Sequence, residues 1–140
     1  MTDGDDAVRT LLDKANRALL SARVLLADDD VDGACNRAYY AVFDAARGAL
    51  ASLDPVVDPD EAKTHRGVMS VFDARLVRTG IVPRDLGRLF RRIEGIRLVG
   101  DYRTGSVEPE DAVEAVENAD RFVAAMRSIV ANDTGDPPSE

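Results

Sequence analysis

The stretch that decides the fold is Val31–Leu53, which reads VDGACNRAYYAVFDAARGALASL. Its apolar residues cover most of the circumference of a helix. They leave only a narrow polar strip, which holds Asn36, Arg37, Asp44 and Arg47. A helix that is apolar on nearly all sides is buried among its neighbours, so we expect this segment to be the central helix of a bundle.

Four further segments carry apolar residues at the three- and four-residue spacing of an amphipathic helix, over about 5–27, 59–79, 83–100 and 109–130. For the third helix we expect Asp58 as N-cap and Pro59 at the first helical position. For the fourth we expect Gly100 as the C-terminal stop. Nothing in the sequence alternates like a strand, so these helices predict an all-α, up-and-down bundle of about five helices.

The spacing also predicts which residues face the core in the last three helices. These inward-facing residues are His65, Val68, Met69, Phe72 and Leu76 in the third helix, Leu86, Leu89, Phe90, Ile93, Ile96 and Arg97 in the fourth, and Val113, Val116, Ala119, Val123, Met126 and Val130 in the fifth. We expect one helical domain over residues 1–131 and a disordered polar tail over 132–140.

Composition excludes several classes of protein. A chain of 140 residues with a net charge of −8 does not fit indiscriminate binding of nucleic acid. Cys35 and His65 are the only cysteine and histidine, too few for a Cys/His zinc site, and we expect no cofactor and no metal. Without a membrane-spanning stretch or a signal-peptide pattern after Met1, we expect a cytoplasmic protein with no membrane contact.

Arg97 does not fit an ordinary bundle, because it lies in register with Phe90 and Ile93. Its guanidinium therefore points toward apolar surroundings and needs a partner. Asp101 stands four residues later and could supply it, with Tyr102 next to it. One interpretation is an ion pair that anchors the end of the helix; the other is a binding site for phosphate.

Two other groups of residues leave both a structural and a functional interpretation open. Tyr39 and Tyr40 diverge by about 100° on a helix, so one can enter the core while the other faces a groove or a partner. His65 is either a hydrogen-bonded core or cap residue, or a general base or phosphate ligand. Four arginines of the fourth helix form either a solvated face or a contact for phosphate or an acidic partner: Arg84, Arg88, Arg91 and Arg92.

Three separated segments together resemble the HEPN family in its small stand-alone prokaryotic form. They are NRAYYAVF from Asn36, KTHRGV from Lys63 and RLVGDY from Arg97. The resemblance implies a helical bundle that commonly dimerises. Many HEPN proteins are metal-independent ribonucleases with an Arg-x(4–6)-His signature; others bind or regulate, often beside a minimal nucleotidyltransferase. Here Arg97 matches the arginine, but no histidine follows it in the chain, so the nuclease signature is not intact.

The resemblance implies a homodimer that forms one half of a toxin–antitoxin or related nucleotidyltransferase pair and that associates with RNA or a nucleotide. Binding of nucleotide, RNA or partner would then involve Arg37, Tyr40, Arg97 and Tyr102, and Tyr102 is the candidate for modification by the partner. Metal-independent RNA cleavage at an altered site is an alternative and would use Arg97, Asp101 and His65. A helical scaffold unrelated to nucleotides is a third.

Overall fold

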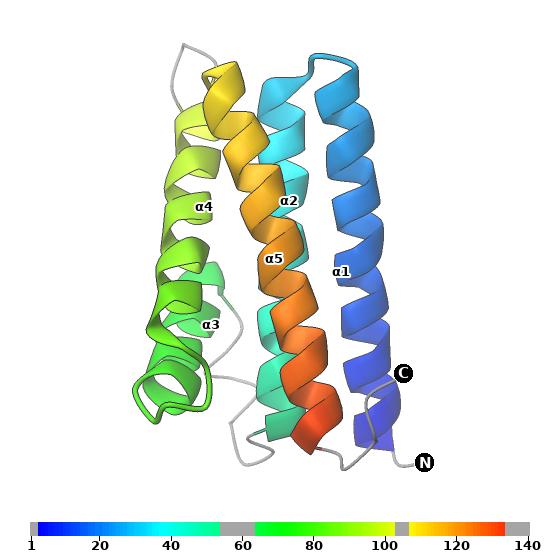
Figure 1. Ribbon diagram of the computed structural model, residues 1–140, viewed down its shortest axis with the longest axis vertical. Helices are drawn as coiled ribbons and strands as arrows, with labels where there is room; N and C mark the ends of the chain where they lie inside the picture. The colour runs from blue at the N-terminus through cyan, green and yellow to red at the C-terminus, as the bar shows by residue number, and fades with distance from the viewer. Residues whose placement is uncertain (1–2, 54–63, 103–106, 134–140) are drawn as a thin grey trace.

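The chain is an all-α bundle (Figure 1), seen in a computed structural model that describes residues 3–53, 64–102 and 107–133. The elements in chain order are α1 Asp3–Ala27, α2 Val31–Leu53, α3 His65–Phe72, the short π-helix η2 Asp73–Val77, α4 Arg84–Tyr102 and α5 Pro109–Asp133. Since η2 continues α3 directly, the predicted architecture of five helices is confirmed.

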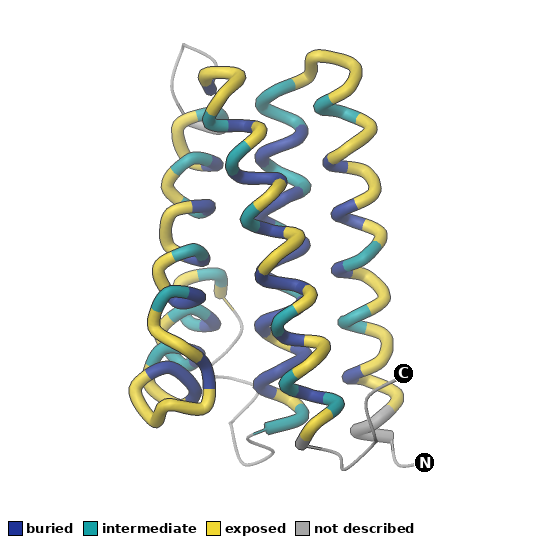
Figure 2. The backbone as a smooth tube through the Cα atoms, in the orientation of Figure 1, coloured by how far each residue is buried: buried dark blue, intermediate teal, exposed yellow. Residues whose placement is uncertain are grey.

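The prediction that α2 is the central helix is confirmed. It packs against α1, α3, α4 and α5, and the tube in Figure 2 is buried along most of its length. From Ala41 to Leu50 only Asp44 and Arg47 escape full burial. The many alanines of α2 let the neighbouring helices approach closely, and the buried apolar residues of the described chain form one continuous core.

A tight turn joins α1 to α2, and the run of aspartates there has a structural purpose. Asp29 adopts the left-handed conformation, with φ of 61°, which aspartate tolerates better than most residues. The side chain of Asp30 accepts a hydrogen bond of 2.9 Å from the backbone N–H of Gly33. Asp30 therefore caps the N-terminus of α2.

The third helix begins at His65, because Thr64 is extended and its hydroxyl accepts a hydrogen bond of 2.8 Å from the N–H of Gly67. The predicted cap Asp58 and the predicted start Pro59 lie outside the described residues. After Phe72 the helix widens into η2, where the N–H of Arg78 donates to the carbonyl of Asp73 at 2.9 Å. Gly80, with φ of 84°, follows the end of η2.

The predicted stop of the fourth helix at Gly100 is wrong, because α4 continues to Tyr102. Gly100 serves a close approach between helices instead. A Cβ atom at this position would lie 3.1 Å from Oδ1 of Asp32 and 3.2 Å from Cγ2 of Val107. The same Asp32 oxygen accepts a hydrogen bond of 2.8 Å from the N–H of Val107, which ties the start of α2 to the chain entering α5.

The buried face of α5 differs from the predicted one at one position. Val113 is 41% exposed, whereas Val116, Ala119, Val123, Met126 and Val130 are buried as predicted. Phe122 is fully buried and was missed; its ring lies 5.7 Å from those of Phe72 and Phe90. The first two residues of the predicted tail, 132 and 133, belong to α5, and the remainder of that tail, 134–140, is outside the described residues.

Candidate functional site

Arg97 on α4 is the only charged residue of the described chain that is buried, with 9% of its surface exposed. Its guanidinium carbon lies 4.3 Å from the centre of the Tyr39 ring. A guanidinium placed over an aromatic face at this distance is held by a cation–π interaction, which is stronger where water is excluded. Tyr39 is itself fully buried, so α2 supplies a buried aromatic ring against which the Arg97 guanidinium packs.

His65, the first residue of α3, packs on the same aromatic platform. The centre of its ring lies 4.6 Å from that of Phe43, 5.2 Å from Tyr39 and 5.5 Å from Tyr40. Burial lowers the pKa of His65, and the positive charge of Arg97 lowers it further. The fold thus brings His65 and Arg97 together on one tyrosine, a juxtaposition that the sequence left undecided.

Glu94, one helical turn before Arg97, faces this cluster as well. Its charge partly offsets the lowering of the His65 pKa. Burial and, second, the charge of Glu94 raise the pKa of Tyr39, so its phenol stays protonated. Glu94 was not singled out from the sequence; its spacing of three residues from Arg97 was the signal that could have assigned it to the cluster.

Tyr39 and Tyr40 divide as predicted: Tyr39 is in the core, and Tyr40 is partly exposed. The guanidinium carbon of Arg37 lies 5.6 Å from the centre of the Tyr40 ring. Arg37 also lines an open groove between α1 and α2, together with the exposed apolar residues Leu20 and Val24. Arg37 and Tyr40 therefore form a second, more accessible part of the site.

Asp101 and Tyr102 are the last two residues of α4, and their side chains lie outside the described part of the chain. The predicted pairing of Asp101 with Arg97 and the predicted modification of Tyr102 therefore stay predictions.

The four arginines predicted to share one face of α4 separate in the structure. Arg92 turns toward α5 and forms two hydrogen bonds of 2.8 Å with the carboxylate of Glu114. Arg84, Arg88 and Arg91 instead line a pocket between α4 and η2. The interpretation of all four as a single patch is wrong for Arg92, because its rotation about the helix axis brings it to a different neighbour.

Neither nucleophilic catalysis by cysteine nor metal binding finds support in the described residues. Burial, with the charges of Asp32 and Asp111, raises the pKa of the Cys35 thiol to about 11, so Cys35 is not an activated nucleophile. No group of three or more His, Cys, Asp or Glu side chains in the described ranges could hold a metal ion. Over the same ranges, no helix is long and apolar enough to cross a membrane.

The cluster around Tyr39 combines two chemical capacities. Arg97 offers a fixed positive charge that can pair with a phosphate oxygen. His65, whose pKa is lowered, is mainly neutral near pH 7 and can accept a proton. A phosphate-binding cation and a neutral imidazole within electrostatic reach of each other are two of the parts that metal-independent phosphodiester chemistry requires.

Comparison with known sequences identifies the class. The HEPN domain profile matches residues 8–129, nearly the whole chain, and this chain belongs to the HEPN domain family. A UPF0332 protein of Gloeobacter violaceus is 29% identical over 123 residues, which cover 86% of this chain and 94% of that protein.

Two more relatives cover similar shares. The Methanocaldococcus jannaschii protein named "Putative toxin MJ0605" is 28% identical over 125 residues, covering 89% of this chain and 90% of that protein. A UPF0332 protein of Thermotoga maritima is 28% identical over 118 residues, covering 84% and 86%. The predicted resemblance to small stand-alone HEPN proteins is confirmed.

Proposed function

We propose that this HEPN protein is a toxin-like component of a toxin–antitoxin or related nucleotidyltransferase pair, and that Arg97 binds a phosphate group of RNA or of a nucleotide. The observation that carries the proposal is the burial of Arg97 on the Tyr39 ring. The guanidinium is already ordered before a phosphate binds, so binding loses little side-chain entropy. Family membership and the name of the Methanocaldococcus jannaschii relative support it.

The partner is proposed to be a minimal nucleotidyltransferase that transfers a nucleotidyl group from ATP to the hydroxyl of Tyr102, with release of pyrophosphate. The expected site of action is the cytoplasm, where both ATP and RNA are found, and the expected assembly of the HEPN chain is a homodimer. Arg37 and Tyr40, which are partly exposed on α2, are the proposed contacts for the partner or for RNA.

Intact mass spectrometry tests the partner step. The protein is incubated with a cognate minimal nucleotidyltransferase and ATP, and a mass gain of one nucleotidyl group is expected. Tyr102→Phe removes the acceptor oxygen and is expected to gain nothing. An unchanged mass of the wild-type chain, with a partner shown to be active on another acceptor, would refute the modification.

A second candidate function, metal-independent RNA cleavage, is favoured by the approach of His65 to Arg97. In this mechanism neutral His65 takes the proton from a ribose 2′-hydroxyl, the resulting oxygen attacks the adjacent phosphorus, and Arg97 neutralises the charge that develops on the phosphate. The 5′-oxygen leaves and takes a proton, for which Asp101 or solvent is the proposed source. The products are a 2′,3′-cyclic phosphate and a 5′-hydroxyl.

Cleavage of RNA in the presence of EDTA tests this mechanism. The wild-type chain is compared with Arg97→Ala, His65→Ala and, as a matched arginine outside the cluster, Arg92→Ala. Loss of cleavage in the first two variants, with circular dichroism unchanged and Arg92→Ala active, supports the ribonuclease. Absence of cleavage in the wild-type chain leaves the binding function alone, and undiminished cleavage by Arg97→Ala would rule out this site.

A further inference from the structure

A second basic site lies between the N-terminal half of α4 and η2, away from the cluster around Tyr39. It is an open pocket of about 370 Å³, a volume in the range of small-ligand sites. Its lining includes Arg78, Arg84, Arg88 and Arg91, the single carboxylate Asp73, and Gly87. None of these residues belongs to the His65–Tyr39–Arg97 cluster.

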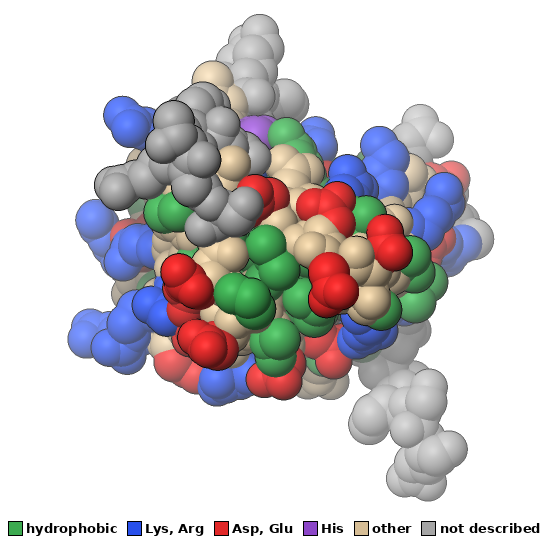
Figure 3. Space-filling model, turned by 90° about the horizontal axis from the view of Figure 1, so that it is seen from above, with side chains coloured by type: hydrophobic (Ala, Val, Ile, Leu, Met, Phe, Trp, Pro, Cys, Tyr) green, Lys and Arg blue, Asp and Glu red, His purple; other side chains and the backbone are tan. Residues whose placement is uncertain are grey.

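The charge of this arginine pocket contrasts with that of the molecule. The whole chain carries a net charge of −8, and in the view from above acidic side chains surround a central apolar patch, while most basic ones lie toward the sides (Figure 3). In the pocket, by contrast, four arginines face one aspartate. A local excess of positive charge in an acidic protein concentrates anions at that one place.

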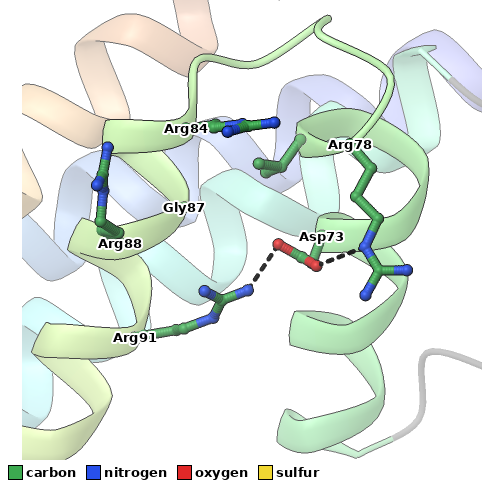
Figure 4. Close-up of a pocket in the computed structure, with 7 residues that line it drawn as sticks. Asp73, Arg78, Arg84, Gly87, Arg88 and Arg91 are labelled. Carbon is green, nitrogen blue, oxygen red and sulfur yellow. Dashed lines mark hydrogen bonds and ion pairs between the residues drawn. The ribbon is translucent and has the colours of Figure 1, made fainter.

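Asp73 fixes two of the four arginines rather than neutralising all of them. One carboxylate oxygen lies 2.7 Å from Nη2 of Arg91, and the other lies 3.3 Å from Nε of Arg78. Figure 4 shows these two contacts meeting at Asp73 from opposite sides of the pocket. Asp73 thus bridges α4 and η2 and holds both guanidiniums at the pocket wall.

The π-helix makes this arrangement possible. In an ordinary α-helix, residues five apart point about 140° away from each other. In η2 the wider turn closes a hydrogen bond of 2.9 Å between Arg78 N–H and the Asp73 carbonyl, and the two side chains meet on the same side. Such π-turns within helices occur frequently at functional sites.

Arg84 and Arg88 remain available to a ligand. Neither forms a hydrogen bond or ion pair with any described residue, in contrast to Arg91 and Arg92. In Figure 4 Arg84 reaches from the start of α4 toward η2, and Arg88 stands at the outer edge. The floor is close-packed at Gly87, where a Cβ atom would lie 3.2 Å from Cγ2 of Val77.

We propose that this arginine pocket binds a small ligand through its phosphate groups. The planar guanidinium presents paired N–H donors that match two phosphate oxygens at once, which a lysine-lined site would not offer. A polyphosphate chain satisfies Arg84 and Arg88, which have no partner among the described residues, while Arg91 and Arg78 stay in place through Asp73. Two sources share this chemistry, a nucleoside triphosphate and inorganic polyphosphate.

Isothermal titration calorimetry of the full chain in EDTA tests the proposal, with ATP and inorganic tripolyphosphate as probes. The variants are Arg84→Gln and Arg88→Gln, both at exposed positions without partners in the described chain, so folding is expected to persist. The matched control is Arg92→Gln, an exposed arginine of the same helix that faces Glu114 instead. Each pocket variant is expected to weaken binding about tenfold, and Arg92→Gln to leave it unchanged.

The outcomes separate the ligands. ATP binding more tightly than tripolyphosphate supports a nucleotide, and equal affinities support the phosphate chain alone. Failure of both probes to bind overturns the proposal. The proposal is also overturned if Arg92→Gln weakens binding as much as the pocket variants do, because the loss would then follow from the removal of any positive charge. If single-stranded RNA binds through Arg84 and Arg88 while neither small probe binds, the proposal of a small ligand is overturned and the ligand of the pocket is a nucleic-acid strand.

Discussion

Tyr39 is the residue that makes a site out of two distant parts of the sequence. His65 and Arg97 belong to different helices, and each packs against the ring of Tyr39. Because Arg97 is buried and positively charged, it acts on the titration of His65 through a medium that screens charge poorly. The change in the pKa of His65 when Arg97 is replaced therefore shows whether the two residues share one site.

The pKa of His65 predicts a pH dependence of stability. Its pKa in the folded chain lies below the ordinary value of 6.5, first because of burial and second because of Arg97. As pH falls through 6.5, the unfolded chain takes up this proton while the folded chain resists it, so the free energy of unfolding decreases. Urea unfolding at pH 7.5 and pH 5.5 is expected to show a larger loss for the wild-type chain than for His65→Gln.

The same residue provides a direct spectroscopic test, because His65 is the only histidine. After removal of any histidine tag, one imidazole resonance titrates in the proton NMR spectrum. Arg97→Gln is expected to raise that pKa toward 6.5, and Arg92→Gln to leave it in place. An unshifted His65 pKa in Arg97→Gln would contradict the shared site.

Arg97 is also predicted to stabilise the fold through its planar shape, not only through its charge. Arg97→Lys keeps the charge but replaces the stacked guanidinium with a compact ammonium that hydrates strongly. We expect the free energy of unfolding to fall by about 1–2 kcal/mol, at most the full value of about 2 kcal/mol for a desolvated cation–π contact, because lysine keeps part of the attraction. The matched change Arg92→Lys, at an exposed ion pair, is expected to cost less than about 1 kcal/mol; equal losses in chemical denaturation would contradict the stacking argument.

At the scale of elements, hydrophobic periodicity predicted correctly the features that depend on the sequence of a single helix. The central position of α2 followed from its own apolar circumference, and the burial of Leu86, Phe90 and Ile93 on α4 followed from their spacing. The face of α5 was harder, because its buried side is largely made of alanines such as Ala112 and Ala115. Alanine is common on both faces of a helix, so only the larger apolar residues indicated which face of α5 is buried. On that basis Val113 was assigned to the wrong face.

What could not be predicted depends on contacts between helices. The meeting of His65 with Arg97 requires the place of Tyr39 between α3 and α4. The separation of Arg92 from Arg91 requires Glu114 on α5 and Asp73 on η2. Gly100 was interpreted as a local signal for a helix end, although its cause is the approach of Asp32 and Val107 from other parts of the chain.

The two glycines Gly95 and Gly100 of α4 are expected to respond oppositely to alanine. A Cβ atom at Gly95 meets nothing within 4 Å, so Gly95→Ala is expected to stabilise the helix by about 0.5–1 kcal/mol. At Gly100 the added atom would crowd Asp32, which is held by its hydrogen bond to Val107. We expect Gly100→Ala to lower the thermal midpoint; a gain equal to that of Gly95→Ala would show that α2 and α4 separate without cost.

At the scale of the whole molecule, the net charge of −8 constrains assembly. Because both copies of the expected homodimer carry this negative charge, they repel each other at long range. Salt screens this repulsion, since the Debye length falls from about 30 Å at 0.01 M to about 8 Å at 0.15 M. An interface built on apolar contacts is little affected by that change.

The expected homodimer is therefore predicted to tighten with salt. Sedimentation velocity at 10 mM and 150 mM NaCl is expected to give a dissociation constant several-fold lower at the higher concentration, because only the repulsive contribution is screened. Phosphate binding in the arginine pocket must show the opposite trend, since salt competes with an attraction there. A dimer that loosens with salt would mean that its interface joins the arginines of one copy to the acids of the other, and a monomer under both conditions would refute the homodimer.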